Sequence, residues 1–225
     1  MDSKTLKEKI FAYSFVQAED KQCIDRLFKD VRVNESSLRQ KLVQIVKNSK
    51  SPQNAIDLIV ELLVACELLE LSETESITFA ENPDLYLELS QQRFAIEVKN
   101  FRYREKDNKD GLSFEQAGQV GRLTEYGDSE NVQTQMENVL TKKANNCSVE
   151  NPLILFLQSR SPHNVEAIEA KCAARTVFYN GNHSNLLGIM FRMNNSHPLL
   201  FHRADNESEQ KIVESFRQRF YRLSV

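Results

Sequence analysis

The fold is decided by residues 77–102, whose sequence is ITFAENPDLYLELSQQRFAIEVKNFR. Leucine recurs at every second position of 85–89, and Phe94, Ile96 and Val98 repeat that pattern after a polar break. An alternation with a period of two is typical of strands that have one apolar face. The segment therefore predicts a β-hairpin.

Three ionisable side chains share the other face of this predicted hairpin. If residues 91–92 form a two-residue turn, Asp84 pairs with Lys99. Tyr86 then pairs with Glu97, and Glu97 lies diagonal to Asp84. A slip of one residue in the pairing would separate the three groups, so their juxtaposition depends on the register.

Two carboxylates a few ångströms apart repel by roughly 4 kcal/mol at an effective dielectric constant near 20, so a cation is expected between Asp84 and Glu97. Mg²⁺ takes oxygen ligands from one or two carboxylates and keeps several waters, and the carbonyl of Val98 is a further candidate ligand. Such a metal polarises a phosphoryl oxygen and activates a bound water. Lys99 would orient that water or neutralise charge on the phosphate.

The pattern Pro83-Asp84 followed by Glu97-Val98-Lys99 resembles the signature of the PD-(D/E)xK phosphodiesterase superfamily. The resemblance implies a restriction-endonuclease-like fold and a nuclease that depends on Mg²⁺ or Mn²⁺. In that superfamily a glutamate from the helix before the hairpin often completes the metal site.

Two glutamates of a predicted helix over 52–71 are candidates for that position. The resemblance favours Glu61, which opens a Leu-Leu-Val-Ala run, and Glu67 is the second choice. A buried carboxylate without a partner is costly, which favours Glu61 facing a cation. The alternative is that Glu61 lies at the border of the helix and is solvated.

The hairpin also has a purely structural interpretation. Oppositely charged residues that face each other across strands stabilise a sheet by about 0.2–1 kcal/mol without any chemistry. An amphipathic hairpin with a charged outer face would carry the same residues.

The whole sequence predicts an α/β fold with a mixed central β-sheet flanked by helices. Residues 1–50 are predicted to form an N-terminal helical arm, which either packs on the core or forms a separate binding module. Residues 51–225 would form the nuclease-like domain. The continuous apolar run 153–157 indicates a central strand covered on both faces. The other expected elements are strands at 76–81, 186–191 and 199–202, and helices at 113–121, 131–146, 164–174 and 207–223.

A net charge of −3 does not by itself indicate a nucleic-acid-binding protein, but the basic residues are grouped. Those after Lys99 would suit a phosphate backbone, or would form a solvated loop with neighbouring acids. Four glutamines are candidates for supporting the site or contacting nucleic acid: Gln116, Gln119, Gln133 and Gln135. The basic groups are Arg102, Arg104, Lys106 and Lys109, then Lys142 and Lys143, and finally Arg217, Arg219 and Arg222.

Composition also predicts where the protein acts. The sequence has no apolar run of 18 residues, so a membrane partner is not expected. Its start lacks the apolar core of a signal peptide. Four widely spaced cysteines suit free thiols in a reducing compartment, and we therefore expect a cytoplasmic protein.

The leading hypothesis is a metal-dependent nuclease in which Asp84, Glu97 and Glu61 bind Mg²⁺ and Lys99 assists the water. DNA is favoured over RNA as the partner, and double-strand cleavage would suit a homodimer. The alternative is a non-catalytic module on the same fold that binds nucleic acid or another protein.

Overall fold

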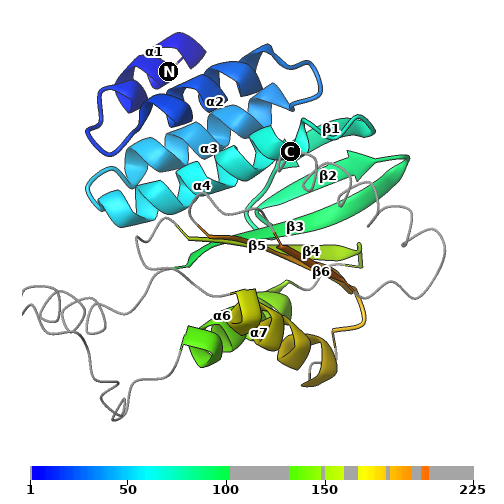
Figure 1. Cartoon of the computed structure of the whole chain (residues 1–225). Coiled ribbons are helices and arrows are strands. Elements are labelled where there is room, and N and C mark those ends of the chain that lie inside the picture. Colours follow the sequence, from blue (N-terminus) through cyan, green and yellow to red (C-terminus); the bar gives the residue numbers. More distant parts are fainter. Residues whose placement is uncertain are drawn as a thin grey trace, which may run out of the picture.

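The computed structural model describes residues 2–101, 132–147, 150–159, 167–180, 183–193 and 199–202. They form a six-stranded sheet in which the strands lie in sequence order, with helices on both faces (Figure 1). The predicted mixed α/β fold is therefore confirmed. The strands are β1 (Thr74–Phe79), β2 (Leu85–Leu89), β3 (Gln92–Phe101), β4 (Leu153–Ser159), β5 (Leu186–Met193) and β6 (Leu199–His202).

The sheet changes from antiparallel to parallel pairing at β3. The pairs β1/β2, β2/β3 and β5/β6 are antiparallel, whereas β3/β4 and β4/β5 are parallel. Helices α6 (Val132–Asn146) and α7 (Ala167–Asn180) lie in the two parallel crossovers. Two crossovers of the same handedness that move across the sheet in the same direction place their helices on the same face of the sheet. Figure 1 shows α6 and α7 together on one face.

Four helices cover the opposite face, with α4 lying nearest to the sheet (Figure 1). Residues of the predicted arm, such as Ile10 and Leu42, belong to the same buried cluster as Leu87 and Ile96 of the hairpin. Of the two alternatives for residues 1–50, the structure shows packing on the sheet. The four helices are α1 (Ser3–Phe11), α2 (Ala18–Lys29), α3 (Glu35–Lys47) and α4 (Pro52–Leu68).

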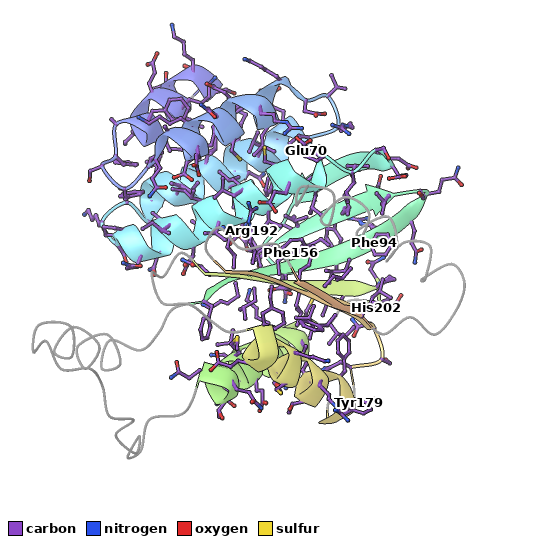
Figure 2. The ribbon with its side chains drawn as sticks, viewed as in Figure 1. Glu70, Phe94, Phe156, Tyr179, Arg192 and His202 are labelled. Atoms are coloured by element: carbon purple, nitrogen blue, oxygen red, sulfur yellow. The ribbon has the colours of Figure 1, made fainter. Side chains whose placement is uncertain are left out.

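The apolar runs explain why the sheet and α4 form the core. Helix α4 begins with Pro52 in its first turn, a position that tolerates the missing amide hydrogen. Strand β4 is buried on both faces, because Ile154 and Phe156 join the cluster under α4 while Leu155 joins the cluster under α6 and α7. Figure 2 shows Phe156 on the α4 side of the sheet, whereas the exposed Tyr179 projects from α7. The prediction of a doubly covered central strand is confirmed.

The predicted hairpin register is wrong by one turn position. Leu89 pairs with Gln92 and Leu85 with Ile96, so the turn consists of Ser90 and Gln91. Both turn residues have positive φ, 51° and 63°, as two-residue hairpin turns with the right twist require. Moving the turn by one residue changes each pairing by two positions, so the side chains keep their faces.

The helix boundaries differ slightly from the expected ones. Helix α6 matches its predicted range, whereas α7 runs to Asn180 because Val177 continues the buried stripe of Ala170 and Ala173. The helices expected at 113–121 and 207–223 lie outside the described residues. Within the described part of the chain, no helix combines the length and apolarity needed to span a membrane.

Candidate functional site

Asp84 and Glu97 lie opposite each other at the end of the hairpin. Asp84 comes one residue before β2, and the pairing of Leu85 with Ile96 extends to place it across from Glu97. The backbone N–H of Val98 donates a hydrogen bond of 2.7 Å to Oδ2 of Asp84. The side chains are buried, since the two residues are only 8% and 5% exposed. The corrected register thus brings the two acids closer than the diagonal that the sequence predicted.

A lysine from α6 holds both carboxylates. Nζ of Lys143 lies 3.1 Å from Oδ2 of Asp84 and also donates a short hydrogen bond to Oε2 of Glu97. In the sequence, Lys143 was identified only as part of a basic pair. Its spacing could also have predicted that its side chain is partly buried. Lys143 lies seven residues after Met136 and three after Leu140, and so falls on the buried stripe of its helix.

The charges in this cluster alter one another's protonation. Burial, and next the negative charge of Asp84, raise the pKa of Glu97 to about 7, although the hydrogen bond from Lys143 opposes the rise. Burial lowers the pKa of Lys143, but the charge of Asp84 and the bond to Glu97 outweigh it and hold that pKa above its ordinary value. When ionised, the two acids carry one negative charge more than Lys143 neutralises.

Glu61 lies near this cluster but has a cation of its own. Nζ of Lys41, from α3, is 2.5 Å from Oε2 of Glu61 and also donates a 3.1 Å hydrogen bond to the carbonyl of Ala80. Burial, and then the charge of Asp84, raise the pKa of Glu61 above its ordinary value. Of the two alternatives for Glu61, the structure shows a buried carboxylate facing a cation, and that cation is Lys41.

Lys41 is the second residue that the sequence analysis missed. It follows Leu38 by three residues and precedes Ile45 by four, so it too falls on an apolar helical stripe. One turn earlier, the hydroxyl of Ser37 accepts a 3.0 Å hydrogen bond from the backbone of Phe79. This contact ties α3 to the end of β1 and aims Lys41 at the loop that leads to Asp84.

Of the remaining predicted site residues, Lys99 and Val98 adjoin Glu97 in β3, whereas Glu67 lies on α4. Lys99 is half-buried and follows Glu97 by two residues in β3, so alternation puts it on the same face. In a β-strand the N–H and the C=O of one residue point to the same side of the strand. Because the N–H of Val98 points toward Asp84, the carbonyl of Val98 also faces that side, where β2 has ended. Glu67, the second choice on α4, instead pairs with Arg192 of β5. In Figure 2 Arg192 lies between α4 and the sheet.

A polar groove of about 830 Å³ opens beside the Lys41–Glu61 pair. It runs along α3 and the end of β1, and Lys41 and Ala80 are common to the groove and to the hydrogen bonds of Glu61. Its charged lining residues are basic at Arg39, Lys41 and Lys47 and acidic at Glu35 and Glu81.

Several predicted nucleic-acid contacts lie outside the described residues. Two of the predicted glutamines do lie in the described part of the chain. Gln133 donates a 2.7 Å hydrogen bond to Glu137, and Gln135 is buried. The bond of Gln133 therefore joins it to a residue of its own helix. The predicted contacts outside the described part are Arg102, Arg104, Lys106, Lys109, Gln116, Gln119, Arg217, Arg219 and Arg222.

Comparison of the chain with protein-family models, curated proteins and solved structures found no match. No three His, Cys, Asp or Glu side chains of the described residues gather closely enough to hold a metal ion unaided. Two buried carboxylates that already share one ammonium nevertheless make a position for a cation, and Mg²⁺ needs only one or two protein carboxylates.

Proposed function

We propose that this protein is a divalent-cation-dependent nuclease that hydrolyses phosphodiester bonds, with DNA favoured over RNA as substrate. The observation that carries the proposal is the convergence of Asp84 and Glu97 on a single cation. The resemblance of Pro83-Asp84 and Glu97-Val98-Lys99 to the PD-(D/E)xK signature supports it, and so does the mixed α/β fold.

Asp84 and Glu97 would hold Mg²⁺ or Mn²⁺, with the Val98 carbonyl as a further oxygen donor. A bound ion would polarise a phosphoryl oxygen and increase the acidity of a water. The Val98 amide orients Asp84 through its 2.7 Å hydrogen bond, which fixes the carboxylate before any ligand arrives. Glu61 would contribute negative charge from α4 while Lys41 limits its repulsion of Asp84.

Two lysines would act on the substrate. Lys99, on the same face as Glu97, and Lys143 would neutralise the phosphate as negative charge develops on it. The water oxygen forms the new bond to phosphorus and the bond to the leaving sugar oxygen breaks. That oxygen leaves with a proton, so one water is consumed for each bond cleaved.

Labelled DNA and RNA incubated with Mg²⁺, Mn²⁺ or chelator would test the proposal. We expect metal-dependent cleavage that Asp84→Asn and Glu97→Gln reduce by at least about 100-fold, and Lys99→Ala by a similar factor. Glu88→Gln is the matched control, because Glu88 is an exposed acid of β2 bonded to Ser76. Cleavage that survives the changes at Asp84 and Lys99 would reject the assignment.

One observation favours a second candidate, a non-catalytic module that binds nucleic acid. The ammonium of Lys143 already bonds to both carboxylates, so the cluster forms an ion network without a metal. This candidate predicts salt-sensitive binding of nucleic acid that persists in chelator, with no cleavage in any metal.

A further inference from the structure

We infer that the ammonium of Lys143 is a built-in occupant of the divalent-cation position, so that Lys143 and the metal exclude each other from Asp84 and Glu97. This inference rests on the metal site of the proposed function and adds the way in which that site is loaded. Through Lys143, helix α6 would then control the affinity of the site for the cation.

Lys143 already occupies one oxygen of each acid. Lys143 uses Oδ2 of Asp84 and Oε2 of Glu97, oxygens that are also the candidate ligands of a metal. Oδ2 of Asp84 already accepts the hydrogen bond from the Val98 amide. Two cations on the same pair of oxygens would repel each other strongly in a buried site, so one must leave before the other binds.

Lys143 is the cation that can leave. Its side chain is 27% exposed, compared with 4% for Lys41, and it stands in the last turn of α6. A lysine carries its charge on a flexible four-carbon stem, so the ammonium can withdraw toward solvent without moving the helix. The withdrawn ammonium would stay beside the acids, where a phosphate oxygen can accept its hydrogen bonds.

Competition sets the apparent affinity for the metal. If Lys143 occupies the acids for about nine-tenths of the time, the apparent affinity falls about tenfold below that of the free pair. Removing the ammonium should therefore tighten metal binding. If Lys143 instead supported the bound metal, its removal would weaken binding. Without metal, the same change leaves two buried acids unpaired, so the metal should also stabilise the altered protein more than the wild type.

The test measures Mn²⁺ alone, with no nucleic acid. Free Mn²⁺ is followed by electron paramagnetic resonance, and the melting temperature is recorded in EDTA and in Mn²⁺. For Lys143→Met we expect binding about tenfold tighter than wild type, a lower melting temperature in EDTA and a larger rise with Mn²⁺. The matched control is Lys142→Met, the exposed neighbour on the same helix, which should behave as wild type. Adding Asp84→Asn to Lys143→Met should remove the gain.

A measurement on the wild type keeps the test valid if Lys143→Met does not fold. Acetylation of lysines by acetic anhydride, read by mass spectrometry, should increase several-fold at Lys143 when Mn²⁺ is added and stay constant at Lys142. Affinity that is unchanged or weaker in Lys143→Met, or an acetylation rate at Lys143 that Mn²⁺ does not change, would overturn the inference.

The outcomes separate this inference from the proposed function. Cleavage by the wild type with no gain of affinity in Lys143→Met would overturn the inference and leave the nuclease standing. Tighter Mn²⁺ binding in Lys143→Met with no cleavage by any variant would support the inference and overturn the nuclease. No Mn²⁺ binding by any variant would overturn both.

Discussion

Two buried lysine–carboxylate clusters of the described residues differ in charge balance and in access. Lys41 and Glu61 form a one-to-one pair between α3 and α4, with side chains that are 4% and 10% exposed. Lys143 instead serves two acids, Asp84 and Glu97, and its own side chain is 27% exposed. Both lysines occupy apolar stripes of their helices, so burial alone does not distinguish the clusters.

The difference separates a structural ion pair from a candidate site. A balanced, largely buried pair has no excess charge for another ligand to neutralise, and breaking it leaves a buried charge. A cluster in which two acids share one partly exposed ammonium keeps an excess negative charge, which a divalent cation that displaces the ammonium can neutralise. Three measurements test this difference, in addition to the cleavage and Mn²⁺ experiments.

The largest effect is expected at the balanced pair. Lys41→Met should lower the free energy of unfolding by about 3 kcal/mol, because it leaves Glu61 buried without its cation. Urea denaturation measures the loss, and replacing Glu61 with Leu in the same chain should recover most of it. Lys47→Met, at an exposed position of α3, is the control and should stay within about 0.5 kcal/mol of wild type. A loss below about 1 kcal/mol would mean that the pair is not a structural one.

The next effect is a dependence of stability on pH at the unbalanced cluster. The pKa of Glu97 is about 7 in the folded protein and 4.5 ordinarily, so folding favours its protonated form. Its contribution to stability is complete below about pH 4.5 and is lost as the pH rises through about 7. Relative to Glu97→Gln, the wild type should lose about 3 kcal/mol between pH 4.5 and 8, in chelator. Parallel curves for the two proteins over that range would contradict the assignment.

The smallest effect concerns salt. Because Lys143 is partly exposed, its coupling to Asp84 should be screened, whereas that of Lys41 to Glu61 should not. Double-mutant cycles at 0.05 and 0.5 M salt, built on Lys143→Met with Asp84→Asn and on Lys41→Met with Glu61→Gln, measure both couplings. We expect a decrease of about 0.5 kcal/mol in the first and no change in the second. Equal screening of the two would show that access does not distinguish them.

Much of the fold was predictable because the signals were local. The alternation in 85–89 and 94–98 identified β2 and β3, and the unbroken apolar run 153–157 identified a strand covered on both sides. The same-face position of Asp84 and Glu97 survived an error in the turn, because shifting a hairpin turn by one residue preserves the parity of the pairing. Side-chain alternation is a property of each strand and needs no knowledge of its partner.

The strands, the apolar helix α4 and the two acids that share a face were predictable from the chain alone, since each follows from a repeat within a few residues. Which cation each acid meets depends instead on the tertiary structure. Lys143 is 46 residues from Glu97, and Lys41 is 20 residues from Glu61. Each pairing depends on how helices distant in sequence pack on the sheet. The apolar stripes show that these lysines are buried, but a stripe carries no information about the charge on the element that will cover it.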